Sequence, residues 1–220
     1  MTAPVELALC GSNVTGDVPF SCALRLPHGI VAAQSAAGAR GDLVQLIADL
    51  CAKNGVTPEQ VASIRVDVGP GSYTGLRVVV TFVRFLQRFG GVSVQAIDSL
   101  ALLAARAAGQ APTGRIVAVL DARRNRVHRQ AFTVQDGIVA CAPAAAMPLA
   151  DVLADLRSDD LVLVPESLPE ALRAPLVSRA TVRTERALVA AEMWTPGLPF
   201  AAASAADLEP RYLMASYAED

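Results

Sequence analysis

The chain has 220 residues, of which 53% are hydrophobic, and its 21 acidic and 19 basic residues give a formal net charge of -2. This length fits one large domain or two small ones, and the apolar fraction is enough to bury a substantial core. The charge balance excludes both a basic field over the whole molecule and the acidic excess of a disordered chain. The N-terminus lacks a basic segment followed by a long apolar one, and no apolar run approaches the roughly 20 residues that cross a bilayer. We therefore expect a cytoplasmic protein without membrane contact.

The first half of the chain is predicted to contain four strands and one helix, in the order β-β-β-α-β. Alternating and continuous apolar runs favour strands, and apolar residues three and four apart favour a helix. The strands are predicted at Val5–Leu9, Ser21–Leu26, Ile30–Gln34 and Ile64–Val68, and the helix runs from Asp42 to Lys53.

The second half repeats this order of elements. Strands are predicted at Ile116–Leu120, Val127–Val134, Ile138–Cys141 and Leu161–Val164, and a helix at Leu149–Arg157. The four residues that begin at Gly29 recur from Gly137, in the third-strand position of each half. Because the segment 109–114 is rich in Gly and Pro and has no apolar period, we place the boundary between an N-terminal half, 1–108, and a C-terminal half, 109–220. The chain is predicted to be an α/β protein of two halves, each a mixed sheet with packed helices.

The stretch Gly69-Pro70-Gly71-Ser72-Tyr73-Thr74-Gly75-Leu76-Arg77 joins a predicted strand to a predicted helix. A helix N-terminus can bind an anion, but the spacing fits neither a Walker loop nor the G-x-G-x-x-G dinucleotide pattern. A serine elbow also fails, since Ser72 has Pro70 and Thr74 two positions away instead of glycines. The alternative is a structural turn, in which glycines supply positive φ, Pro70 fixes the turn, and Ser72 or Thr74 caps the helix.

The helix predicted from Leu76 to Phe89 carries more apolar surface than one buried face requires. Its polar residues Arg77, Thr81, Arg84 and Arg88 form one narrow stripe, and the rest is mostly large and apolar. The Asp42–Lys53 helix shows the same surplus. The two helices are therefore either wholly buried or packed on a second subunit by one side. We expect the partner contacts at Leu43, Leu46, Ile47, Leu50, Val79, Phe82, Val83 and Leu86.

The sequence offers few candidates for catalysis or metal binding. The two histidines, His28 and His128, are a hundred residues apart and form no zinc-binding pair, so we predict no catalytic residue, no metal and no cofactor. Four cysteines are widely spaced and are predicted to be small core residues: Cys10, Cys22, Cys51 and Cys141.

One basic cluster follows Asp121 at a predicted strand end. It comprises Arg123, Arg124, Arg126, His128 and Arg129. It could touch a phosphate backbone, but no aromatic neighbour is present to stack a base, so a solvated hairpin tip is the alternative. Asp121 has no carboxylate near it in sequence and could equally cap the turn.

These residues resemble those of the TsaB (YeaZ) family of bacterial tRNA threonylcarbamoyladenosine biosynthesis. The stretch 69–77 is similar to the family signature G-P-G-S-[FY]-T-G-[LV]-R, and three further motifs agree. These are Asp98-Ser99-Leu100, Leu120-Asp121-Ala122-Arg123, and Glu209-Pro210-Arg211-Tyr212-Leu213. The chain departs from the family at Leu9-Cys10-Gly11-Ser12, where members have Asp-Thr-Ala/Ser, and at Ala39-Arg40-Gly41-Asp42, which lacks a family histidine.

The resemblance implies a duplicated actin-like (ASKHA, ribonuclease-H-type) fold and a non-catalytic subunit that activates the larger paralogue TsaD. It also implies a TsaE-like ATPase as a further partner, homodimers through the same helices, and contact with tRNA only through the complex. Because the first strand lacks the carboxylate that could hold a nucleotide-bound metal, we expect no ATP binding by this chain alone. A hydrolase that acts through the glycine stretch is the alternative, since relatives carry the label glycoprotease.

Overall fold

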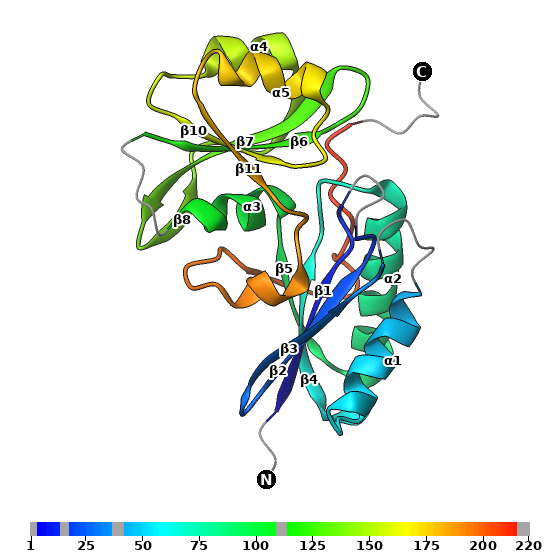
Figure 1. Ribbon diagram of the computed structural model, residues 1–220. Coiled ribbons are helices and arrows are strands. Elements are labelled where there is room, and N and C mark those ends of the chain that lie inside the picture. Colours follow the sequence, from blue (N-terminus) through cyan, green and yellow to red (C-terminus); the bar gives the residue numbers. More distant parts are fainter. Residues whose placement is uncertain (1–3, 14–17, 37–41, 109–113, 215–220) are drawn as a thin grey trace.

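The computed structural model describes residues 4–13, 18–36, 42–108 and 114–214. Two mixed sheets lie in two halves, each covered by helices (Figure 1). The described strands and helices follow the expected β-β-β-α-β order in the first half, and in the second half one further short strand, Ala145–Pro148, stands between the third strand and the helix.

The first sheet has the strand order β12-β5-β4-β1-β2-β3. Its strands are β1 (Val5–Cys10), β2 (Ser21–Leu26), β3 (Gly29–Gln34), β4 (Val61–Asp67), β5 (Ser93–Ile97) and β12 (Ala201–Ala203). β1, β2 and β3 form an antiparallel meander, and β4 and β5 run parallel to β1. β12 comes from the far end of the chain and pairs antiparallel with β5.

The second sheet repeats this topology with the order β11-β10-β6-β7-β8. Its strands are β6 (Ile116–Asp121), β7 (Arg126–Gln135), β8 (Gly137–Ala140), β10 (Leu161–Pro165) and β11 (Thr181–Glu185), and β9 (Ala145–Pro148) pairs with β7. The third strands of the two halves, β3 and β8, begin at Gly29 and Gly137, so the repeated tetrapeptide occupies equivalent positions.

The helices of the first half are α1 (Leu43–Lys53) and α2 (Tyr73–Gly90), and a short 3-10 turn, η1 (Pro58–Gln60), precedes β4. α1 and α2 lie side by side on one face of the first sheet (Figure 1). Asp42 caps α1 by accepting a hydrogen bond from the Gln45 N–H at 3.1 Å. α2 ends at Gly91, whose φ of 67° is the left-handed cap that glycine favours.

The remaining helices are α3 (Ser99–Ala108), α4 (Leu149–Asp155), α5 (Glu170–Val177) and the 3-10 turn η2 (Ala190–Trp194). α4 and α5 cover the outer face of the second sheet, whereas α3 lies between the halves (Figure 1). Almost every α3 residue is buried, and α3 packs in one apolar cluster with Cys10 of β1 and Phe132 of β7. The two halves therefore share a core. The boundary predicted at 108/109 stays a prediction, since residues 109–113 lie outside the described ones.

Candidate functional site

The glycine stretch is a tight loop between the end of β4 and the start of α2. Gly69 adopts a φ of 104°, a conformation that side chains disfavour, and the Gly69–Pro70 peptide bond is cis. Ser72 is the N-cap of α2, and its hydroxyl oxygen accepts a hydrogen bond from the Gly75 N–H at 3.2 Å. The Ser72 hydroxyl thus holds the first helical turn, as the structural-turn alternative predicted.

Two glycines of this loop allow the backbone to pack directly on the residues that follow β1. A Cβ on Gly71 would lie 2.1 Å from the Ser12 carbonyl oxygen, and one on Gly75 would lie 2.1 Å from the Gly11 carbonyl oxygen. The Ser72 N–H donates to the Ser12 carbonyl at 2.7 Å. The loop is therefore locked to the end of the first strand by contacts that no larger residue permits.

A fully buried carboxylate, Asp67, lies beneath the loop at the end of β4. It accepts hydrogen bonds from the hydroxyls of Ser12 and Ser99, the latter at 2.5 Å, from the Gly69 N–H at 2.9 Å, and from the Cys10 thiol at 3.3 Å. Burial raises the pKa of Asp67 above its ordinary value, although these hydrogen bonds lower it. Since all four donors come from segments that meet here, Asp67 joins β1, β4, α3 and the loop.

Sequence reasoning missed Asp67. Its position was read only as part of an apolar strand, although an aspartate at the C-terminal end of a buried strand, directly before a glycine turn, is a signal that could have pointed to a buried polar centre.

A late segment of the chain, around Arg211, docks on the same loop. The Arg211 N–H donates to the Val68 carbonyl at 2.7 Å, and the Arg211 guanidinium binds the Asp98 carboxylate at 2.6 Å. Asp98 also caps α3 by accepting from the Leu100 N–H at 2.8 Å. Burial raises the pKa of Asp98 to about 6, even though Arg211 and the Leu100 N–H favour the ionised form. The expected motifs around residues 98–100 and 209–213 thus meet in space.

An aromatic and cationic group covers the first turn of α2. The rings of Tyr73 and Tyr212 lie 4.9 Å apart, and the Arg77 guanidinium lies 5.2 Å from the Tyr73 ring centre. Arg77 also donates to the Tyr73 hydroxyl oxygen at 2.9 Å. Both tyrosines are about half exposed, at 50% and 45%, so this group is open to solvent.

The space between the halves is small where the glycine loop faces the second sheet. A cavity of about 10 Å³ is lined by Ser12 and Gly71 of the first half and by Leu120, Pro165 and Arg186 of the second, among others. A space of this size admits about one water molecule at most.

The structure corrects the partner contacts that were predicted on α1 and α2. Five of the eight residues expected at a partner interface belong to the chain's own core: Leu43, Ile47, Leu50, Val79 and Val83, none more than 9% exposed. Leu46, Phe82 and Leu86 are partly buried against that core. A partner cannot reach the five because α1 and α2 press them against the first sheet.

The two helices nevertheless carry exposed apolar side chains on their outer side. Val78, Phe85 and Phe89 of α2 are 41%, 60% and 75% exposed, and Val44 of α1 is 57% exposed. The rings of Phe85 and Phe89 lie 4.8 Å apart. We call the three α2 residues the outer apolar face. The polar stripe Arg77, Thr81, Arg84 and Arg88 is also exposed.

The basic cluster is divided between a hairpin tip and the strand that follows it. Arg123, Arg124 and Asn125 form the exposed tip, with positive φ angles of 66°, 50° and 59°. The Asp121 carboxylate accepts from the Arg123 N–H at 2.7 Å, which caps the turn. Left-handed backbone costs roughly 1–2 kcal/mol for each residue other than glycine or asparagine.

In β7, Arg129 is paired with Asp155, and the Arg126 guanidinium donates to the Ala146 carbonyl at 2.8 Å. His128 is buried, which lowers its pKa to about 4. The cluster is therefore not one continuous basic patch, and the cations at its exposed tip are Arg123 and Arg124.

Other expected features can be located. Cys10, Cys22 and Cys51 are buried as expected, whereas Cys141 is exposed, because it follows β8 in a surface turn. Among residues 4–13, 18–36, 42–108 and 114–214, no group of three or more His, Cys, Asp or Glu side chains could hold a metal ion. In the same ranges, no helix is both long enough and apolar enough to cross a membrane.

These observations define a class. Each half has the strand order 3-2-1-4-5, in which strands 1, 2 and 3 pair antiparallel and strands 4 and 5 run parallel to strand 1. The same order in both halves indicates a duplication. This is the α/β architecture of two mixed sheets that the sequence predicted, and it agrees with the duplicated, ribonuclease-H-type fold that the resemblance implied.

Comparison with known proteins gives the family. The profile of the family described as "TsaD: tRNA N6-adenosine threonylcarbamoyltransferase" matches residues 24–162, which is more than half of the chain. The chain therefore belongs to this family, and the resemblance to the TsaB (YeaZ) proteins is confirmed.

Individual proteins similar to this chain agree with the family assignment. The chain is 34% identical over 106 residues to the tRNA threonylcarbamoyladenosine biosynthesis protein TsaB of Bacillus subtilis, a match that covers 48% of this chain and 45% of that protein. The chain thus matches less than half the length of this curated relative. Two solved structures from Pseudomonas aeruginosa share the fold at 22% identity. YeaZ has a TM-score of 0.73 over 94% of this chain and 100% of its own, and a protein described as similar to the peptidase YeaZ has 0.74 over 96% and 100%.

Proposed function

We propose that this chain takes part in tRNA threonylcarbamoyladenosine biosynthesis as a non-catalytic subunit, which binds and activates a TsaD-like catalytic paralogue. The observation that carries the proposal is the outer apolar face, where two phenylalanines and one valine are 41–75% exposed along α2. Large apolar side chains gathered on one face are typical of sites that a partner covers. The family and the name of the B. subtilis relative supply the pathway.

The glycine loop supports an accessory role. Ser72 caps α2, and every donor around Asp67 is directed at its carboxylate, so the groups that could do chemistry there are engaged in holding the fold. A hydrolase that acts through this loop would need at least one of these groups to give up its present hydrogen bonds and face a substrate.

A helix-on-helix contact suits the outer apolar face, because Val78, Phe85 and Phe89 recur at i, i+7 and i+11 and make one ridge along α2. The same ridge could pair with itself in a homodimer when the paralogue is absent. A TsaE-like ATPase would then join the complex elsewhere.

The test is a pair of single variants, Phe85→Asp and Phe89→Asp, measured for binding to the TsaD-like paralogue of the same organism and for stimulation of threonylcarbamoyl transfer to tRNA. Since both side chains are exposed, we expect each variant to fold normally and to bind at least tenfold more weakly. Val177→Asp is the matched control, because Val177 is also 60% exposed but lies on α5 in the other half.

Wild-type affinity and stimulation in both phenylalanine variants would contradict the proposed interface. Peptide or ester hydrolysis by the pure protein that disappears in Ser72→Ala would support the hydrolase instead.

A further inference from the structure

Beside the outer apolar face, α2 carries a row of three arginines. Arg77, Arg84 and Arg88 each directly precede one residue of that face in the sequence, and all three side chains are exposed. Neighbouring residues of a helix point about 100° apart, and residues seven or eleven apart point in nearly the same direction. The cationic and the apolar side chains therefore form two parallel rows on one surface of α2, and we call the first of them the arginine row.

Two members of the arginine row have no counter-ion in the described part of the chain. Within residues 4–13, 18–36, 42–108 and 114–214, Arg84 and Arg88 form no ion pair and no side-chain hydrogen bond, whereas Arg77 donates to the Tyr73 hydroxyl oxygen at 2.9 Å. α2 contains no acidic residue that could pair with them one helical turn away. Arg84 and Arg88 are themselves one turn apart, a spacing at which like charges repel. The fold therefore gains no electrostatic attraction from this pair.

The position of the arginine row beside exposed phenylalanines distinguishes it from an ordinary solvated surface. Protein interfaces have an apolar centre and a polar rim, and arginine is enriched in them whereas lysine is depleted. A phosphate backbone would also attract the arginines, but it would leave Phe85 and Phe89, which are 60% and 75% exposed, in water. A protein surface that carries carboxylates beside apolar side chains matches both rows at once.

A second copy of this chain complements the surface poorly. α1 and α2 together contain four cationic residues, Lys53 and the arginine row, and one acidic residue, Asp49, whose carboxylate already accepts a hydrogen bond from Gln45 at 2.8 Å. In a two-fold contact between antiparallel α2 helices, the flank that carries the arginine row lies opposite the same flank of the other copy. In a parallel contact it lies opposite the other flank of α2, beside α1. Either arrangement leaves most of the arginines without a carboxylate.

We infer that the arginine row is the electrostatic part of the partner contact: it binds carboxylates on the surface of the catalytic paralogue that covers the outer apolar face, and it makes this contact tighter than the contact between two copies of this chain. The identity of the partner rests on the proposed function, whereas the required negative charge rests on α2 alone. The partner surface is therefore defined by its chemistry, as an apolar helix surface bordered by acidic side chains.

The experiment combines Arg84→Gln with Arg88→Gln in the full chain, because glutamine suits a helix and is uncharged. A second variant, Arg84→Lys with Arg88→Lys, keeps the charge. The matched control combines Arg157→Gln with Arg179→Gln, which removes the same charge from two exposed positions of the other half. Calorimetric titration with the TsaD-like paralogue of the same organism and sedimentation equilibrium of each chain alone are carried out at about 50 mM and about 300 mM NaCl. Circular dichroism and binding of unmodified tRNA are measured on the same samples.

At low salt we expect the glutamine variant to bind the paralogue roughly five- to tenfold more weakly than the wild type, since two contacts between opposite charges are lost. The difference should shrink at high salt, which screens exposed charges. The lysine variant and the control should stay within about threefold of the wild type.

Self-association should respond with the opposite sign. It should be no weaker in the glutamine variant than in the wild type, and in the wild type it should strengthen as salt screens the facing arginines. A wild-type chain that stays monomeric at both salt concentrations supports the same order of affinities, because its contact with the paralogue is then the tighter one.

Equal affinity and equal salt dependence in the glutamine variant and the wild type would overturn the inference, and so would self-association that is weaker in the glutamine variant. A loss of tRNA binding without a change in affinity for the paralogue would assign the arginine row to RNA instead. In these three outcomes the proposed function survives, because the wild type still binds the paralogue. If the wild type does not bind it at all, or if Phe85→Asp and Phe89→Asp bind it as the wild type does, the proposed interface fails and the inference fails with it.

Discussion

The carboxylate of Asp98 and the guanidinium of Arg211 lie 2.6 Å apart, although 113 positions separate them in the sequence. This pair joins the start of α3 to the C-terminal segment and sits beside the glycine loop, where the Arg211 N–H is also bound. Its members differ in environment, because the Asp98 side chain is 11% exposed and that of Arg211 is 42% exposed.

We expect the Asp98 carboxyl to make stability fall as pH rises. Its pKa is about 6 in the folded protein against 3.8 for the ordinary side chain, so its contribution is fully present below about pH 4 and is lost as pH rises through 6. Relative to Asp98→Asn, which cannot titrate, the wild type should lose roughly 2 kcal/mol of unfolding free energy between pH 4 and pH 7. Urea unfolding at a series of pH values measures this difference. A difference that stays constant with pH would contradict it.

Two glycine substitutions in α2 should have opposite effects. Gly75→Ala places a methyl group 2.1 Å from the Gly11 carbonyl oxygen, which is backbone and cannot move aside, so we expect a loss of about 3 kcal/mol or more. In Gly90→Ala the nearest atom, on Val92, is 3.9 Å away, and the change should stabilise the helix end by up to about 1 kcal/mol. Thermal unfolding of both variants checks the pair. Equal effects would mean that the loop does not pack on the end of β1.

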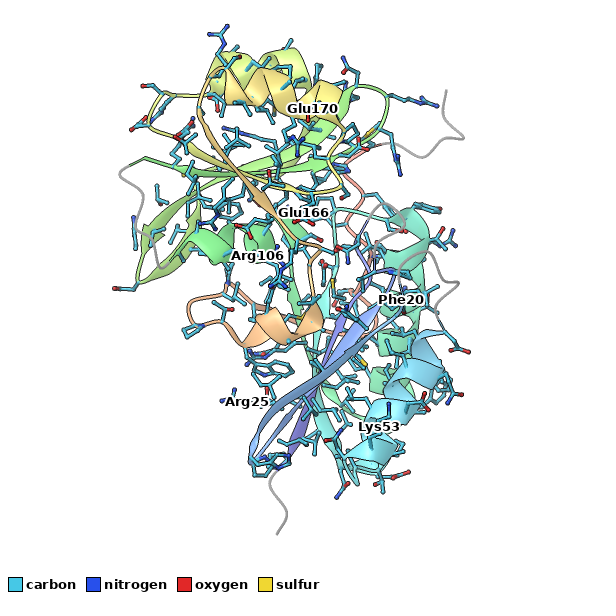
Figure 2. The ribbon with its side chains drawn as sticks, viewed as in Figure 1. Phe20, Arg25, Lys53, Arg106, Glu166 and Glu170 are labelled. Carbon is cyan, nitrogen blue, oxygen red and sulfur yellow. The ribbon has the colours of Figure 1, made fainter. Side chains whose placement is uncertain are left out.

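Arg106 of α3 should be sensitive to replacement even by lysine. Its guanidinium binds Glu192 at 2.8 Å and the carbonyl oxygens of Arg186 and Ala187 at 2.5 and 2.9 Å, and Figure 2 places it between α3 and the segment that leads to η2. Lysine keeps the charge but cannot make these forked contacts. We expect Arg106→Ala to cost roughly 2–3 kcal/mol and Arg106→Lys to recover less than half of it, measured by chemical denaturation. Full recovery by lysine would show that charge alone matters.

Thiol accessibility gives an inexpensive check of the fold. Cys141 is exposed, whereas Cys10, Cys22 and Cys51 are buried, and burial raises the pKa of the Cys22 thiol to about 12. Titration with a chromogenic disulfide reagent at pH 8 should therefore find one fast thiol in the native protein and four after denaturation. The fast reaction should be absent in Cys141→Ser. More than one fast thiol in the native wild type would contradict the described core.

The order of the elements along the chain was predictable because short apolar runs mark β1, β2 and β3 and recur in β6, β7 and β8. The residues that α1 and α2 leave exposed were not predictable. α2 is apolar both toward the sheet, at Val79, and toward solvent, at Phe85, and periodicity cannot say which apolar side faces outward. The exposed polar stripe, which includes Arg84 and Arg88, is narrow and does not show which of the two apolar sides is buried.

Features that depend on residues far apart in the chain, such as β12 and the hydrogen bonds to Asp67, leave weaker signals in the sequence. β12 consists of three alanines, which carry no strand preference, and it forms only because β5 offers a free edge. In the sequence Asp67 is one polar residue within an apolar run. Its hydrogen-bond donors Ser12 and Ser99 lie far from it along the chain and meet it only in the folded structure.

The return of the chain to its first sheet sets an order of events during synthesis. β5 is complete once residue 97 has been made, but β12, its neighbour on the outer edge, comes more than a hundred residues later, and so does Arg211. While the ribosome makes the second half, the outer edge of β5 is open and Asp98 has no cation beside it. An open strand edge is a template for pairing with other chains. The growing polypeptide therefore passes through a period in which its earlier half must be kept from other chains, and that period ends only when residues 201–211 have emerged.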